Sequence, residues 1–162
     1  ASGTGIVCKG DSTIWIATGG GEKARVFKSI NRGESWKIYN TPMRGGEGNG
    51  IYSMTFFDER NGIIVGGNYL DSLNTKGSCA VTSDGGETWQ LISVNGPRGY
   101  RSCVAVNNNF AIAVGRTGID ITSDKGYYWM PLSNEGYYSC VLNTRIGWLT
   151  GRKGKLAKVT IK

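Results

Sequence analysis

Histidine is absent from the 162-residue sequence. Its absence excludes Ser-His-Asp and Cys-His catalytic groups and every histidine-ligated metal site. The four cysteines form no CxxC pair, so the sequence predicts neither a zinc ribbon nor a thioredoxin-like motif. The apolar runs are only about as long as a β-strand, so no transmembrane segment is predicted. We expect no metal ion and no cofactor.

Proline is also scarce, with 3 residues, whereas glycine occurs 26 times and tryptophan 5 times. Short runs rich in valine, isoleucine, threonine and tyrosine alternate with glycine-containing turns, a pattern typical of β-strands joined by tight turns. Hydrophobic residues make up 39% of the chain, which is enough for a packed core. We therefore predict an all-β fold.

One eight-residue motif occurs three times, at Ser29–Trp36 (SINRGESW), Thr82–Trp89 (TSDGGETW) and Thr122–Trp129 (TSDKGYYW). The Asp or Asn is expected to accept turn hydrogen bonds, the glycine to supply an unusual backbone angle, and the tryptophan to pack between blades. We assign a structural role to Ser29, Asn31, Gly33, Trp36, Thr82, Asp84, Gly86, Trp89, Thr122, Asp124, Gly126 and Trp129.

The motifs lie within longer units that repeat a strand-turn-strand pattern. Their tryptophans are spaced as the blades of a β-propeller require, at intervals of about 40 to 50 residues. Four-stranded antiparallel blades are predicted at approximately 3–41, 50–93, 99–133 and 136–162, the last without a motif or a fourth strand. Residues 1–162 would then form a single partial propeller of about three and a half to four blades, whose open ends could associate with another copy.

These motifs resemble the Asp-box (BNR) repeat of β-propellers, which include sialidases and the photosystem II stability/assembly-factor-like proteins of bacteria. Asn31 departs from the usual Asp but can accept the same hydrogen bonds. Resemblance to the assembly-factor-like group implies that this chain is the C-terminal half of a propeller of about seven blades. It also implies a protein that binds another protein without catalysis.

Alternating strand directions send all three motifs to one rim of the propeller. The opposite rim is expected to gather arginines and tyrosines that could bind carboxylates, phosphates or an acidic protein surface, although each arginine could equally be a solvated side chain. We expect Arg101 and Arg116 to converge near the mouth of the channel. Arg44, Tyr69, Asp71 and Lys153 are expected on this rim, with the binding candidates Arg98, Tyr100, Arg101, Arg116, Tyr137, Tyr138 and Arg152.

A formal net charge of +7 favours an acidic partner. No nucleic-acid-binding motif is present, so we expect a protein partner and no specific nucleic acid. The alternatives are a sialidase-like glycoside hydrolase, which would need two suitably spaced catalytic groups, and a propeller that binds carbohydrate. We expect a periplasmic or extracellular location, with a cytoplasmic one as the alternative.

Cys103 and Cys140 occupy equivalent places in the segments YRSC and YYSC, as Met54 does in IYSM. Equivalence to methionine favours apolar packing. Side chains in corresponding places on neighbouring blades are expected to lie too far apart for a disulfide, which is therefore not predicted.

Overall fold

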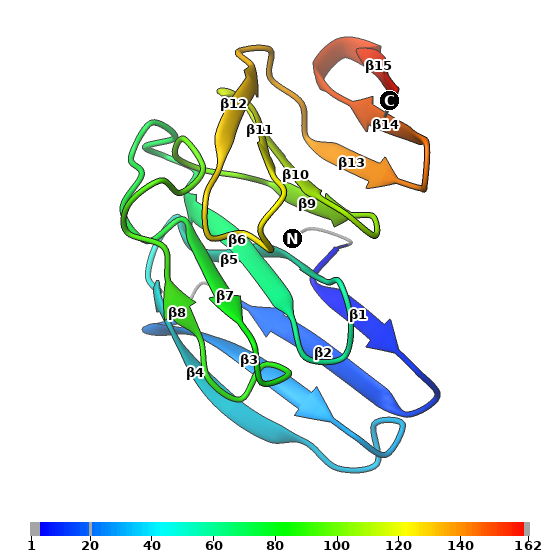
Figure 1. Cartoon of the computed structure of the whole chain (residues 1–162). Coiled ribbons are helices and arrows are strands. Elements are labelled where there is room, and N and C mark those ends of the chain that lie inside the picture. Colours follow the sequence, from blue (N-terminus) through cyan, green and yellow to red (C-terminus); the bar gives the residue numbers. More distant parts are fainter. Residues whose placement is uncertain (1–3, 20, 161–162) are drawn as a thin grey trace.

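The computed structural model describes residues 4–19 and 21–160, which form four antiparallel sheets in chain order (Figure 1). The first contains β1 (Ile6–Lys9), β2 (Thr13–Thr18), β3 (Lys23–Ser29) and β4 (Lys37–Arg44). The second contains β5 (Asn49–Phe56), β6 (Gly62–Asn68), β7 (Cys79–Thr82) and β8 (Gln90–Leu91). The third contains β9 (Cys103–Val106), β10 (Ala111–Gly115), β11 (Gly118–Thr122) and β12 (Met130–Ser133). The fourth contains β13 (Ser139–Leu142), β14 (Ile146–Thr150) and β15 (Leu156–Thr160), with a short 3-10 turn, η1 (Arg152–Gly154), between the last two.

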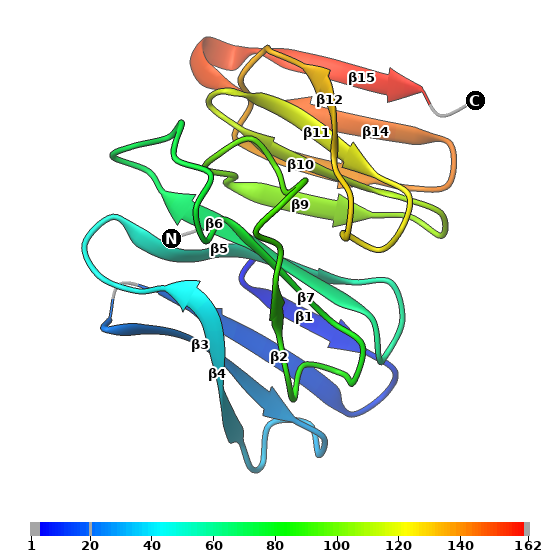
Figure 2. The same ribbon diagram turned by 60° about the vertical axis from the view of Figure 1, so that its left-hand side comes forward.

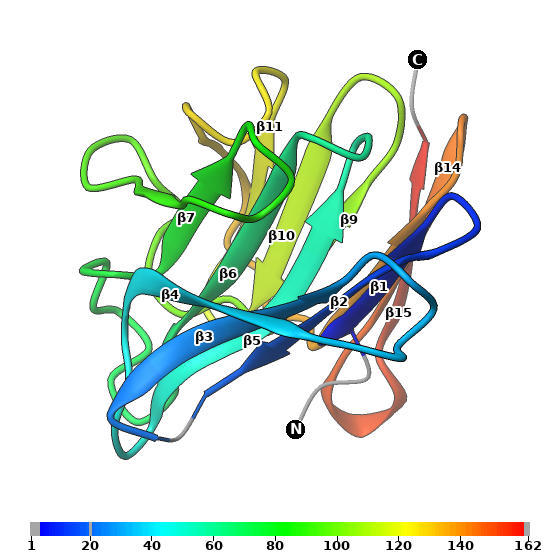
Figure 3. The same ribbon diagram turned by 90° about the horizontal axis from the view of Figure 1, so that it is seen from below.

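Each sheet is an up-and-down meander, and successive sheets stack one beyond another (Figure 2). The first strands of successive sheets contact one another in the order β1, β5, β9, β13, and β5 and β9 lie side by side near the centre of Figure 3. This is the arrangement of propeller blades around an axis, so we call the sheets the first to fourth blades. The predicted all-β propeller is confirmed. Residue 3 and residues 161–162, at the limits of the expected ranges, lie outside the described residues.

The core lies between the blades, because each sheet turns apolar side chains toward both neighbours. Between the first two blades, the Trp15 ring stacks on Phe56 at a centroid distance of 4.1 Å, and Trp89 meets Phe56 edge-on at 6.2 Å. Trp15 Nε1 also donates to the carbonyl oxygen of Gly85 at 2.8 Å. Two further apolar clusters fill the next interfaces, one around Val65 and Trp129 and one around Ile112 and Leu149.

The three repeated motifs form turns with the same hydrogen-bond pattern, and we call them the box turns. In the second, Thr82 Oγ1 donates to Asp84 Oδ1 at 2.7 Å and accepts from the backbone N–H of Gly86 at 2.9 Å. Asp84 accepts from the backbone N–H groups of Glu87 and Thr88, three and four residues further on. Burial raises the pKa of the Asp84 carboxyl, but these hydrogen bonds outweigh burial and hold the pKa at about 2.

The indole at the end of each box turn folds back onto its glycine. Trp89 Nε1 donates to the carbonyl oxygen of Gly86 at 3.1 Å, and Trp129 repeats the contact at 2.9 Å. Both rings pack against the preceding blade and are at most 9% exposed. Trp36 makes the same hydrogen bond, but its side chain is 37% exposed, so it does not pack between two of the described blades. The reason is that no described blade lies beyond the first.

The expectation about the cysteines is also wrong in its geometry. The sulfur atoms of Cys103 and Cys140 lie 3.6 Å apart, in contact across the third and fourth blades. Strand register explains the error, because Cys103 pairs with Val114 whereas Ser139, not Cys140, pairs with the corresponding Thr150. The two cysteines are therefore one position out of equivalence. This offset brings them together.

The outer face of the fourth blade carries exposed apolar side chains. Val141 pairs with Trp148 across the sheet, and Leu156 lies on the same face, with exposures of 60%, 44% and 62%. We expect the isolated chain to self-associate through this face, because patches of this kind mark interaction surfaces. Sedimentation velocity at several concentrations should show an average mass that rises with concentration, and Trp148→Lys should suppress the rise. Wild-type protein that stays monomeric at high concentration would contradict this prediction.

Candidate functional site

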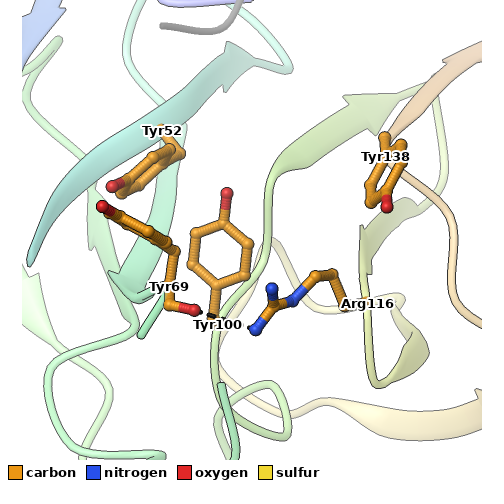
Figure 4. Close-up of a pocket in the computed structure, with 5 residues that line it drawn as sticks. All are labelled: Tyr52, Tyr69, Tyr100, Arg116 and Tyr138. Carbon is orange, nitrogen blue, oxygen red and sulfur yellow. Dashed lines mark hydrogen bonds between the residues drawn. The ribbon is translucent and has the colours of Figure 1, made fainter. Parts of the chain in front are cut away.

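The two rims of the propeller are built as expected from the meander. The first and second box turns contact the first turn of their own blades: the N–H of Arg32 donates to the carbonyl oxygen of Ser12 at 2.9 Å, and the N–H of Gly85 to that of Arg60 at 2.8 Å. The opposite rim contains a pocket of about 510 Å³ close to the innermost strands (Figure 4). Three blades contribute to the pocket, which we call the tyrosine pocket, and its lining residues are Tyr52, Tyr69, Tyr100, Arg116 and Tyr138.

Three of the tyrosines form one side of the tyrosine pocket. The Tyr52 ring, on β5, meets the Tyr100 ring edge-on at a centroid distance of 4.9 Å and the Tyr69 ring at 6.3 Å. Burial raises the pKa of Tyr100 to about 12, and burial with the nearby Tyr69 raises that of Tyr52. Both phenols therefore stay protonated at neutral pH, and the Tyr52 hydroxyl donates to the carbonyl oxygen of Gly48 at 3.3 Å. Tyr138, half exposed, stands across the pocket on the fourth blade.

Arg116 supplies the positive charge of the pocket. It follows Gly115 at the end of β10, where a side chain on that glycine would come within 2.3 Å of the carbonyl oxygen of Tyr100. Its Nη2 donates to the carbonyl oxygen of Tyr69 at 2.9 Å and to Ser72 Oγ at 2.5 Å, which fixes the guanidinium. Among residues 4–19 and 21–160 it has no carboxylate partner, so its charge is available to a ligand.

Arg98 and Arg101 do not face the pocket, and the expected convergence of Arg101 with Arg116 on a ligand is wrong. Arg101 is fully buried and forms a salt bridge from Nε and Nη2 to Asp120 Oδ2, and Nη1 donates to Thr117 Oγ1 at 2.9 Å. Arg98 Nε donates to Asp120 Oδ1 at 2.7 Å. Burial lowers the pKa of the Arg101 guanidinium and Asp120 opposes that shift. Both arginines therefore belong to an internal ion-pair cluster.

Strand register shows why Arg101 is buried. The backbone N–H of Arg101 donates to the carbonyl oxygen of Gly66 in β6, and the N–H of Tyr137 makes the corresponding bond to the carbonyl oxygen of Gly115 one blade later. Arg101 thus occupies the position of Tyr137 and, by register, of Ile51, and all three side chains are buried. Sequence similarity between YRSC and YYSC had suggested an alignment shifted by one residue.

The remaining candidates lie apart from the pocket. Tyr137 is only 5% exposed, with Lys155 Nζ 4.3 Å from its ring centre and Glu135 accepting from its hydroxyl, so the expectation that it binds a partner is wrong. Arg152 and Lys153 are exposed in η1 but do not line the tyrosine pocket. Arg44 lines a separate groove of about 260 Å³ with Lys76, between the first two blades.

Two residues of this region were missed by the sequence analysis. Tyr52 lies at the position of Tyr138 in the repeated segments IYSM and YYSC, so the repeat itself could have revealed it. Asp120 stands two residues before the threonine that opens the third box turn, where the second blade has Ala80. A carboxylate at a repeat position that is apolar in the other blades indicates a buried ion pair.

Within the described ranges, no cluster of three or more histidine, cysteine or acidic side chains is arranged to hold a metal ion. The same ranges contain no helix with the length and hydropathy needed to span a bilayer.

No family model and no curated protein matches the sequence. Solved structures do match. An ancestral GH74 enzyme aligns with a TM-score of 0.67 at 17% identity, over 94% of this chain and 24% of that one. A structure of YCF48 bound to D1 peptide aligns with a TM-score of 0.62 at 18% identity, over 91% of this chain and 48% of that one. The NanB sialidase of Streptococcus pneumoniae aligns with a TM-score of 0.57 at 14% identity, over 96% of this chain and 30% of that one.

These likenesses establish a β-propeller protein. In each case the chain spans less than half of the matched structure. The matched proteins include both enzymes and a peptide-bound protein, so the fold alone does not select a function.

Proposed function

We propose that this protein is a non-catalytic β-propeller module that binds a segment of a protein partner in the tyrosine pocket. The observation that carries the proposal is the Arg116 guanidinium beside four tyrosines, held by two hydrogen bonds and without a carboxylate partner among the described residues. Such a guanidinium favours a carboxylate of the partner, either a side chain or a chain end. Tyrosines supply large, rigid contact area with a polar tip, which suits peptide backbone and apolar side chains. Peptide binding by YCF48, a protein of similar fold, supports the assignment.

The basic charge of the chain supports an acidic partner. The net charge of +7 would accelerate its encounter with negatively charged segments, and the attraction would weaken as salt rises. In this proposal Arg98 and Arg101 hold the rim in place, while Arg116 contacts the ligand. We propose an assembly-factor-like role on the same grounds, and with it a periplasmic or extracellular location.

Peptides selected by display on the immobilised protein test the proposal. We expect enrichment of acidic residues or of a free C-terminal carboxylate. Fluorescence anisotropy on a selected peptide should then show affinity at least about tenfold weaker for Arg116→Ala, since a hydrogen bond to a charged group contributes about 1.5 to 3 kcal/mol. Arg152→Ala is the matched control, because Arg152 is exposed on the same rim outside the pocket, and it should change affinity less than about twofold. Equal losses for the two variants would refute a localised site.

A carbohydrate ligand is the second candidate, favoured by the aromatic lining and by the fold shared with the GH74 and NanB enzymes. Hydrolysis by a pair of carboxylates would require two acidic groups at the site, and the five lining residues include none. A glycan array, with Tyr138→Ala as the comparison variant, separates this candidate from peptide binding. A sialoside turnover assay tests the sialidase-like alternative directly.

A further inference from the structure

Two thiols meet at the interface of the third and fourth blades. Cys103 lies on β9 and Cys140 on β13, with exposures of 1% and 7%, and their sulfurs are 3.6 Å apart. Both are free thiols in the structure. We propose that Cys103 and Cys140 form a disulfide that joins the innermost strands of these two blades.

The contact follows from a hydrogen bond repeated between blades. Between the second and third blades, Ser53 Oγ accepts from the backbone N–H of Val104 at 3.0 Å. One blade later, Cys103 Sγ stands in place of that hydroxyl and accepts from the N–H of Cys140 at 3.4 Å. Because Cys140 occupies the place of Val104, the second sulfur is carried by the residue that donates this hydrogen bond. The two sulfur atoms are already in contact, so only a small further approach brings them to the S–S bond length of about 2 Å.

The local environment activates one of the two thiols. The thiol of Cys140 donates to Cys103 Sγ, and this bond, together with the hydrogen bond from the backbone N–H of Cys140, outweighs burial and lowers the pKa of the Cys103 thiol. The same contact and burial raise the pKa of Cys140. Cys103 is therefore the thiolate that attacks first, and Cys140 resolves the intermediate.

The oxidant we name is a low-molecular-weight disulfide. The Cys103 thiolate attacks one of its sulfurs, forming a mixed disulfide and releasing one thiolate. Cys140 then loses its proton and attacks Cys103 Sγ, forming the protein disulfide and releasing the second thiolate. Two protein thiols give up two protons and two electrons in total, and one small disulfide becomes two thiols. Because the cysteines are buried, this exchange takes place during folding or when the blades separate transiently.

Closing the chain between residues 103 and 140 restricts the unfolded state. A cross-link over a loop of this length raises the folding equilibrium constant by several hundredfold in the chain-entropy model. For a protein of this size, the melting temperature should rise by roughly 10 °C.

The test is refolding from urea in buffer containing oxidised and reduced glutathione, with dithiothreitol as the reduced reference. We expect four free thiols in the reduced protein and two after oxidation. Non-reducing digestion with trypsin, which cleaves after lysine and arginine, should join the peptides 102–116 and 126–145. Cys79→Ser is the matched control, since Cys79 is buried without a cysteine partner, and it should retain the cross-link and the rise in melting temperature. Cys140→Ser should lose both.

Four thiols remaining after oxidative refolding would overturn the proposal, as would cross-links confined to Cys8 or Cys79. A glutathione adduct on Cys103 that Cys140 never resolves would also overturn it. Because the peptide map uses wild-type protein, its result does not depend on whether the serine variants fold.

Discussion

Replacing Asp120 with alanine is expected to lower the free energy of unfolding by about 3 to 5 kcal/mol, because it leaves a buried charge without its partner. Asp120 is 1% exposed and forms salt bridges with Arg98 and with the fully buried Arg101. Urea denaturation should show a reduced midpoint at an unchanged slope. Asp71→Ala is the control, since Asp71 is an exposed carboxylate on the same rim, and it should change stability by less than about 0.5 kcal/mol.

A double substitution distinguishes a lost ion pair from a general loss of packing. The second blade fills the corresponding positions with Ile51 and Ala80, both buried. Arg101→Ile combined with Asp120→Ala copies that pair and should recover much of the stability lost in Asp120→Ala, because no fully buried charge remains and the Arg98 side chain, 36% exposed, can be solvated. A double variant as unstable as Asp120→Ala would show that the charges do not account for the loss.

Replacing Trp89 with alanine is expected to cost about 3 to 5 kcal/mol, because it empties a large buried volume beside Phe56. Asp84→Ala should cost about 1 to 2 kcal/mol, through turn donors that lose their acceptor. Trp36→Ala is the matched control, with the same hydrogen bond and the same place in its box turn but a partly exposed ring. It should cost less than half as much as Trp89→Ala.

Thermal or urea unfolding of the three variants measures these differences. If Asp84→Ala proved more costly than Trp89→Ala, the hydrogen-bonded turn rather than the packed indole would be the main source of stability. If Trp36→Ala matched Trp89→Ala, burial between blades would not be the reason for the loss.

The sequence predicted the fold because three box turns with tryptophan in register define a repeat, and strand direction then decides which loops share a rim. It placed four residues of the tyrosine pocket on one rim, namely Tyr69, Tyr100, Arg116 and Tyr138. It misplaced Arg101 because a one-residue slip moves a strand residue to the opposite face. The similarity of YRSC to YYSC concealed that slip.

The same slip concealed the proximity of the two cysteines. Composition and spacing assign residues to strands, but only the hydrogen-bonded register decides which side chains of neighbouring blades meet. The backbone N–H of Arg101 donates to the carbonyl oxygen of Gly66, and the backbone N–H of Tyr137 makes the equivalent bond to Gly115. Arg101 is therefore equivalent to Tyr137, and Cys103 to Ser139, so that Cys103 lies against Cys140 on the next blade. No local pattern in the sequence encodes that pairing.

The buried pair Arg101 and Asp120 also constrains how this blade could change during evolution. Its counterparts in the second blade, Ile51 and Ala80, are apolar, so each blade has a compatible pair. A route between the two states by single substitutions passes through a chain with one unpaired buried charge, which is the costly intermediate. Once the third blade had acquired both charges, reversal of either one alone would be selected against. The difference between the repeats would then persist even where ligand binding imposes no requirement on these two positions.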